Sequence, residues 1–127
     1  MDTVVTLHVT EEPVVDYASL QNLQKKIGLD QSKEIIERSI FELSDRLWLL
    51  EKAFFENNLE DARSVAQSFC APAEEIGLVE FSKVASDLVS CIDICDFVAT
   101  QAVATRLVRV GECALQHMVH LPEFSTY

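Results

Sequence analysis

Histidine and cysteine are the side chains of this sequence best suited to catalysis or metal binding, and their positions favour neither. The histidines are His8, His117 and His120. His117 and His120 could share one helical face and bind a metal weakly, but we favour a solvent-facing helix end, where a cationic imidazole suits the helix dipole. His8 is interpreted as part of an extended arm. No histidine is therefore placed to act as a base or nucleophile in the central part of the chain.

The cysteines also lack the spacing of a metal site. Three residues separate Cys91 from Cys95, and a zinc site would need a second pair of cysteines or histidines at similar spacing. Cys70 and Cys113 stand apart from this pair. Because cysteine is among the most buried residue types, a packing role is favoured for all of them.

Carboxylates are plentiful but do not form a cofactor motif. The acidic residues between Glu34 and Glu75 have no histidine three residues further on, so the Glu-x-x-His ligands of a di-iron helical bundle are absent. The sequence thus predicts no catalytic residue, no metal and no cofactor, and the chain is not expected to be an enzyme.

The elements that position these residues are predicted to be helices. The chain has only three glycines and three prolines, whereas an all-β domain needs frequent turns that use both. Residues 1–13 are expected to form an extended arm. Asp16 should cap a first helix, and Gly28 should end it in a left-handed C-terminal cap.

The second predicted helix is long and carries two adjoining apolar rows. It covers about residues 31–56, and Asp30 or Ser32 should cap it. Its main row follows alternating steps of three and four residues: Ile36, Ile40, Leu43, Leu47, Leu50 and Phe54. A flanking row recurs every seven residues: Phe41, Trp48 and Phe55. The two rows together predict a helix buried on more than one side.

A third helix is expected after the turn at Asn57 and Asn58. It begins near Leu59 and runs to Cys70 or beyond, with a kink or break at Pro72, because proline cannot donate the helical hydrogen bond. Its inward side chains include Val65 and Phe69, and Gly77 closes the segment.

Two more helices complete the predicted fold. One covers about residues 79–91, and the last begins after a cap at Asp93 or Asp96 and reaches about Met118. The inward row of the last helix is Phe97, Ala104, Leu107, Gly111, Ala114 and Met118. Short connections force neighbouring helices to be antiparallel. The expected fold is all-α, an antiparallel up-down four-helix bundle with an additional N-terminal helix over residues 14–121, followed by a tail at 122–127.

Charge and hydropathy exclude several classes of partner. The formal net charge of -11 disfavours binding to nucleic acid or to an anionic membrane surface. No apolar run approaches the ~18 residues of a membrane span. The first residues lack the basic segment of a signal peptide, and cysteines without such a signal indicate a reducing compartment. A cytoplasmic protein is therefore expected.

Three segments, in order, resemble the histidine-containing phosphotransfer (Hpt) domain of bacterial phosphorelays. Residues 16–28 resemble the family's opening helix and its glycine stop. Residues 58–62, Asn-Leu-Glu-Asp-Ala, resemble the turn into the helix that carries the phospho-accepting histidine. Residues 76–88, which begin Ile-Gly-Leu, resemble the exit from that helix and the start of the next. The resemblance implies the four-helix fold and a role in two-component signal transduction.

The signature of the family, His-x-Leu-Lys-Gly followed six residues later by Gly, is absent here. Aligned on Gly77, the corresponding segment reads Gln-Ser-Phe-Cys-Ala. Gln67 falls on the histidine, while Cys70 and Ala71 replace the lysine and the first glycine. The amide nitrogen of glutamine is conjugated with its carbonyl, so it cannot supply the lone pair that a phosphoramidate bond requires. The resemblance therefore implies a module that has lost its phosphate acceptor.

Around Gln67, small and polar residues are predicted to share one helical face. Steps of three and four residues connect Arg63, Ser64, Gln67, Cys70, Ala71 and Glu74. A solvated face is the plain interpretation. The functional interpretation is a docking face for a response-regulator receiver domain or a histidine kinase. The acidic pocket of a receiver would repel Glu74 unless a basic residue or a metal ion intervenes.

Three functional hypotheses follow from the sequence. The first is an interaction module that binds a receiver or a kinase as a regulator and carries no phosphate. The second is that the same fold serves an unrelated partner, or a second copy of this chain, with signalling lost. The third, an enzyme or metal protein built on the bundle core, is disfavoured because its ligands are missing.

Overall fold

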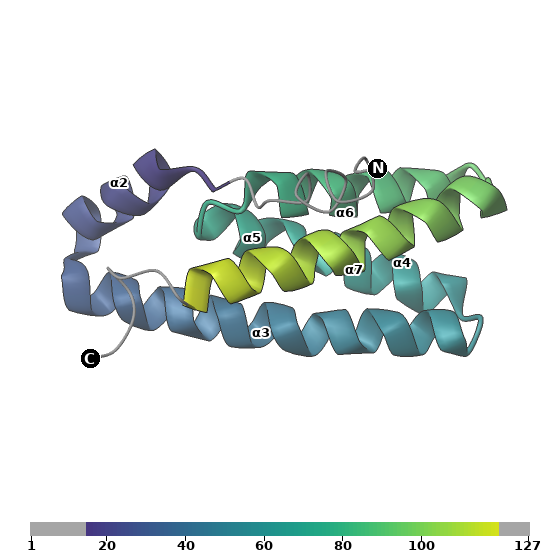
Figure 1. The fold of residues 1–127 in the computed structure, drawn as a ribbon, viewed down its shortest axis with the longest axis horizontal. Coiled ribbons are helices and arrows are strands. Elements are labelled where there is room, and N and C mark those ends of the chain that lie inside the picture. The colour runs from purple at the N-terminus through teal and green to yellow at the C-terminus, as the bar shows by residue number, and fades with distance from the viewer. Residues whose placement is uncertain (1–14, 120–127) are drawn as a thin grey trace, which may run out of the picture.

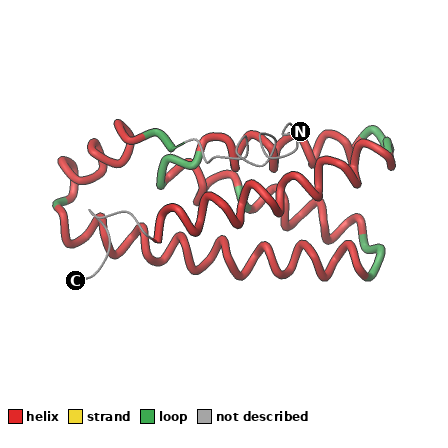
Figure 2. Tube along the Cα trace, in the orientation of Figure 1, coloured by secondary structure: helices red, strands yellow, loops and turns green. Residues whose placement is uncertain are grey.

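Residues 15–119, the part of the chain that the computed structural model describes, form helices joined by short turns. The helices are α2 (Tyr17–Ile27), α3 (Leu29–Phe55), α4 (Leu59–Ser68), α5 (Cys70–Glu75), α6 (Val79–Asp93) and α7 (Phe97–Val119). No strand occurs in these residues (Figure 2), so the predicted all-α class is confirmed. The predicted arm at 1–13 and tail at 122–127, with His8 and His120, lie outside the described residues.

Successive long helices run in alternate directions along a common axis (Figure 1). Both α3 and α6 pack against α4, α5 and α7, while α2 packs on α3. A hydrogen bond of 2.8 Å between Tyr17 Oη and His117 Nε2 also connects α2 to the end of α7. The apolar core lies between these helices.

Gly28 joins α2 directly to α3. Its φ of 92° and ψ of 163° fall in a region that essentially only glycine adopts. Its N–H donates to the Gln24 carbonyl at 2.8 Å, and its own carbonyl accepts from the Ser32 N–H at 3.1 Å. Gly28 ends α2 as predicted, although its ψ is extended. The predicted caps of α3 at Asp30 and Ser32 are wrong, because α3 already begins at Leu29 and the buried Ser32 hydroxyl donates to the Leu29 carbonyl instead.

Two aspartates cap helices as the sequence predicts. The Asp16 carboxylate accepts from the Ser19 hydroxyl at 2.8 Å and from the Ser19 N–H at 3.3 Å. These hydrogen bonds, the one from the hydroxyl first, lower the pKa of Asp16. At the start of α7, Asp96 Oδ1 accepts from the Ala99 N–H at 3.0 Å.

Gly77 allows the turn between α5 and α6 to lie against the start of α2. The Asp16 N–H donates to the Gly77 carbonyl at 2.7 Å. Residue 77 has a φ of 80°, and a Cβ at this position would lie 2.8 Å from the Asp16 carbonyl oxygen. Both the backbone conformation and the space therefore require glycine here.

The main apolar rows form the core as predicted. Buried members include Leu43, Leu47, Leu50, Phe69, Phe81, Leu88 and Leu107, whereas Phe54 and Val65 are only partly buried. At the centre, the ring centroids of Phe69 and Phe81 are 5.2 Å apart. A Cβ on Gly111 would lie 2.9 Å from Phe81 Cζ and 3.0 Å from Leu47 Cδ1. The helix α7 can therefore lie this close to α3 and α6 only because residue 111 has no side chain.

The flanking row of α3 is exposed, so its predicted burial is wrong. Phe41, Trp48 and Phe55 are 74%, 59% and 88% exposed. The neighbours of α3 cover the main row, and the flanking row falls on the outer face. Phe97, predicted to face inward, is 64% exposed because α7 begins there, and the first buried residue of α7 is Thr100.

Replacing Gly111 with alanine tests the close packing at the centre. In a helix interior, alanine ordinarily stabilises the helix by about 1 kcal/mol relative to glycine. Here we expect Gly111→Ala to lower the free energy of unfolding, because overpacking a core typically costs about 1–3 kcal/mol. Urea unfolding measures the change. In a Phe81→Leu background, which removes the ring, the same substitution should cost less. Stabilisation by Gly111→Ala in the otherwise unchanged protein would contradict the prediction.

Candidate functional site

The candidate site is a strip along α4 and α5, named here the α4–α5 strip. It comprises the residues of the predicted face: Arg63, Ser64, Gln67, Cys70, Ala71 and Glu74. The preceding turn is where the sequence places it, with Asn57 at a φ of 58°. Asparagine adopts this left-handed conformation more readily than most residues. The Asn58 side chain then caps α4 by accepting from the Asp61 N–H at 3.0 Å.

The strip crosses a break between α4 and α5. Because Pro72 has no N–H, the Ser68 carbonyl four residues earlier loses its helical donor. Helix α4 ends at Ser68 and α5 begins at Cys70, with the fully buried Phe69 between them. The predicted break is confirmed, and it falls three residues before the proline.

Arg46 of α3 supplies a donor to the Ser68 carbonyl. Its Nη1 lies 3.5 Å from that oxygen and 3.9 Å from Glu42 Oε1. A shallow polar groove surrounds this contact, lined by Glu42, Arg46, Ser68, Ala71, Pro72 and Glu75. Arg46 therefore borders the α4–α5 strip on its α3 side, together with the carboxylates of Glu42 and Glu75. The missing N–H of Pro72 signals an open acceptor at Ser68, but the sequence does not show that Arg46 would fill it.

On the other side, α6 holds the N-terminal part of the strip. Arg63 Nε and Nη2 donate to the two carboxylate oxygens of Asp93 at 2.6 and 3.0 Å. The hydrogen bond and the charge of Arg63 lower the pKa of Asp93. Arg63 Nη1 also donates to Gln67 Oε1 at 3.1 Å. The exposed Gln67 amide, in the last turn of α4, is thus oriented by an arginine that α6 anchors.

Ser82 of α6 holds the other part of the strip. Its hydroxyl donates to Glu74 Oε2 at 2.9 Å, and its carbonyl lies 3.9 Å from the Cys70 thiol sulfur. Cys70 is half-buried and packs against the core, so its predicted place on an open docking face is wrong. Ser64, Gln67, Ala71 and Glu74 are exposed.

The strip offers hydrogen bonds and small side chains rather than reactive groups. Among residues 15–119, no group of three or more histidines, cysteines, aspartates and glutamates could hold a metal ion. His117 lies in the last turn of α7, as predicted, but it is half-buried and hydrogen-bonded to Tyr17, so it is less open to solvent than the sequence predicts. The arrangement is suited to binding another surface.

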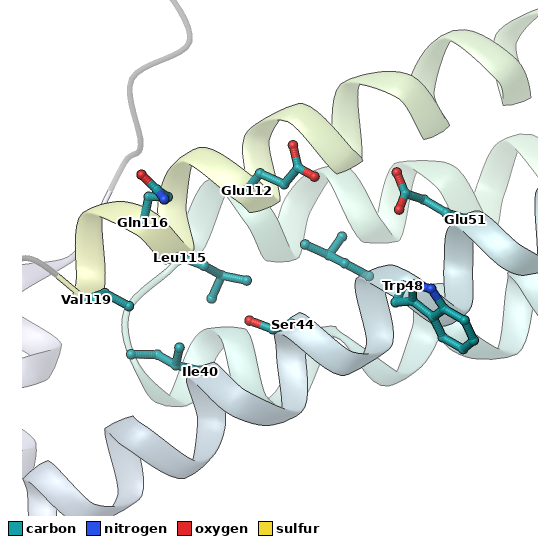
Figure 3. Close-up of a pocket in the computed structure, with 9 residues that line it drawn as sticks. Ile40, Ser44, Trp48, Glu51, Glu112, Leu115, Gln116 and Val119 are labelled. Carbon is teal, nitrogen blue, oxygen red and sulfur yellow. The ribbon is translucent and has the colours of Figure 1, made fainter.

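Another hollow lies elsewhere, between α3 and α7. It is an open groove of about 600 Å³ with Ile40, Leu47 and Leu115 among its lining residues. Figure 3 shows Ile40 and Leu115 between the two helices and Trp48 at the edge. Among residues 15–119, Glu51 and Glu112 are the charged residues that line it, and none of the lining residues is a histidine.

Comparisons with known proteins assign no family to this chain. No model of a known protein family, no curated protein and no solved structure matches this chain. Among the helices of the described region, none combines the length and the apolar character that crossing a membrane requires.

The ion pair between Arg63 and Asp93 predicts a pH-dependent contribution to stability. A carboxyl whose pKa is lower in the folded than in the unfolded state stabilises the fold above its unfolded pKa. That contribution is lost as the pH falls through the folded pKa. We therefore expect Asp93→Asn to be less stable than the unchanged protein at neutral pH, and the difference to vanish in acid.

Urea unfolding across this pH range measures the effect. Asp87→Asn is the matched control, because Asp87 is exposed on the same helix and makes no ion pair with the described residues. A difference for Asp93→Asn that persists unchanged in acid would contradict the role of its charge.

Proposed function

We propose that this chain is a catalytically inactive phosphotransfer-type module that binds a receiver domain or a histidine kinase of a two-component system. The observation that carries the proposal is the exposure of Gln67 on the α4–α5 strip. It lies between the two contacts that hold the strip to α6, Arg63 with Asp93 and Glu74 with Ser82. The resemblance assigns this position to the phospho-accepting histidine. In the same alignment, α3, α4–α5, α6 and α7 correspond to the antiparallel four-helix bundle, and α2 to the opening helix. A cytoplasmic location suits such a role.

The environment of Gly77 supports this alignment. The second glycine of the family signature falls on Gly77, and here a Cβ would strike the Asp16 backbone. A position that requires glycine is what the alignment expects at residue 77. Counting back from Gly77 in this alignment pairs Gln67 with the phospho-accepting histidine of the family.

The residues around Gln67 are consistent with binding that has no transfer step. Phosphoryl transfer to a protein needs a nucleophile with an available lone pair, which a neutral imidazole has and an amide nitrogen lacks. The Gln67 carbonyl oxygen is already bonded to Arg63. Half-buried Cys70, where the family has lysine, supplies no positive charge for a phosphoryl group.

The charges bordering the strip do not remove the predicted repulsion of an acidic partner. Glu74 would repel the acidic pocket of a receiver, and the groove beside Ala71 is lined by Glu42 and Glu75 as well as by Arg46. Asp93 balances the charge of Arg63, and Glu42 lies 3.9 Å from Arg46. The repulsion by Glu74 is therefore a cost of docking an acidic pocket at this strip.

The alternative function is a helical interaction module with an unrelated partner and no part in signalling. The exposed aromatic row of α3 favours this alternative in one respect, since it offers a second surface for protein contact. The two functions differ in whether the α4–α5 strip recognises receivers or kinases.

A matched pair of bulky substitutions tests the proposed docking face. Ala71 is exposed in the strip, and Ala102 is exposed on α7, outside it. In a binding screen against receiver domains and histidine kinases, we expect the unchanged protein to bind at least one of them. Ala71→Trp should weaken that binding by about tenfold or more through steric exclusion, a cost of ~1.4 kcal/mol, while Ala102→Trp should not.

Either of two results would contradict the proposal. One is the absence of binding to every receiver and kinase tested. The other is binding that Ala71→Trp and Ala102→Trp affect equally, which would place the interface on a different surface.

A further inference from the structure

Three aromatic side chains form an exposed row on the outer face of α3. Phe41, Trp48 and Phe55 are spaced by seven residues, which returns each to nearly the same side of a helix. At the helical rise, the row is roughly 21 Å long. No other element among residues 15–119 covers it, since all three side chains are largely exposed. Large aromatic side chains exposed together on one helix face are typical of a site of interaction.

The spacing of the row is symmetric about Trp48. Phe41 precedes Trp48 by seven residues, and Phe55 follows it by seven. If a second α3 crosses antiparallel with Trp48 opposite Trp48, Phe41 of each copy meets Phe55 of the other. A surface that pairs with itself in this way fits a two-fold symmetric contact.

The charges on the same face select the antiparallel direction. Asp45 and Lys52 are both exposed on α3, on the same flank of the row. With Trp48 opposite Trp48, the position level with Asp45 is 51 of the second copy, an exposed glutamate on the other flank, and Lys52 of that copy lies one residue further along, roughly 1.5 Å of helical rise. A parallel pairing would instead place Asp45 against Asp45 and Lys52 against Lys52. Within one chain, Lys52 Nζ lies 5.6 Å from the centre of the Trp48 ring, so its charge belongs to this face. The two ion pairs therefore form within one residue of the register that the aromatic contacts set.

We propose that α3 binds a second copy of this chain through Phe41, Trp48 and Phe55, as an antiparallel dimer with crossed pairs between Asp45 and Lys52. Three aromatics of roughly 150–250 Å² each supply about half of the ~800 Å² that each partner of a standard interface buries. Leu49, at 37% exposure, and the α3 edge of the groove in Figure 3 extend the surface. A dimer of this size should dissociate on dilution.

The proposed dimer does not depend on the proposed docking function. Arg46, which contacts α4, lies two residues from Trp48 and therefore on the opposite side of α3. The α4–α5 strip stays outside the dimer contact. Loss of dimerisation and loss of receiver binding are accordingly separate results.

Sedimentation velocity of the full chain over a dilution series measures the association. The single tryptophan, Trp48, adds a local probe, because its emission should shift to shorter wavelength as the dimer forms and the ring is buried. Trp48→Asp should weaken the dimer by about a hundredfold or more, since central aromatic residues dominate such interfaces. Phe97→Ser, an exposed aromatic on α7, is the control and should leave the association unchanged.

Charge reversal tests the register. Asp45→Lys alone and Lys52→Asp alone each create two like-charge contacts and should raise the dissociation constant about tenfold or more. The double variant Asp45→Lys/Lys52→Asp should recover the original affinity. The two single variants, mixed, should form a heterodimer in which every crossed pair is again attractive.

Three results would overturn the proposal. A chain that stays monomeric at every concentration would show that the row does not bind a second copy. A dimer that survives Trp48→Asp would lie on another surface. A dimer that the single charge reversals leave unchanged, or that the double variant does not restore, would have a different register.

Discussion

The absence of a side chain at Gly111 is the constraint on which the rest of the structure depends. At this point α7 meets Leu47 of α3 and the Phe81 ring of α6, and Phe81 in turn packs on Phe69 at the break between α4 and α5. A methyl group at residue 111 would push α6 away from α7. Ser82 and Asp93 of α6 hold the α4–α5 strip, so their positions follow from this packing.

Pro72 is the second determinant of the structure, because the helix break that it causes at buried Phe69 also shapes the exposed α4–α5 strip. Without its N–H, the helix breaks at a buried phenylalanine, and the open Ser68 carbonyl draws Arg46 toward the strip. Gln67 lies one residue before this carbonyl. The result is a polar surface on α4 and α5, fixed by α3 on one side and α6 on the other, while the apolar surface lies on the outer face of α3. The two surfaces therefore suit different partners.

Local signals predicted the features that depend on neighbouring residues. Asp16 and Asp96 act as caps, Gly28 and Gly77 end their segments, and the helix breaks near Pro72, because each follows from backbone chemistry within a few positions. The cap of α3 is the exception, because Gly28 starts that helix before either Asp30 or Ser32. The row at Phe41 was misplaced because periodicity shows that a face is apolar but not whether another helix covers it. The pair Arg63–Asp93 and the contact of Arg46 with Ser68 join distant parts of the chain, so only the packed structure reveals them.

Incubation with a phosphorylated receiver is the most direct test of the central claim, that the strip retains docking without chemistry. The account predicts no acid-labile phosphate on the unchanged protein and little on Gln67→His, because Cys70 stands where the family has lysine and Asp93 balances the charge of the neighbouring Arg63. More should appear on Gln67→His/Cys70→Lys/Ala71→Gly, provided that its thermal unfolding shows that the half-buried position 70 tolerates lysine. Stable phosphorylation of the unchanged chain, on His117 or His120, would contradict the account, because the protein would then be an active carrier.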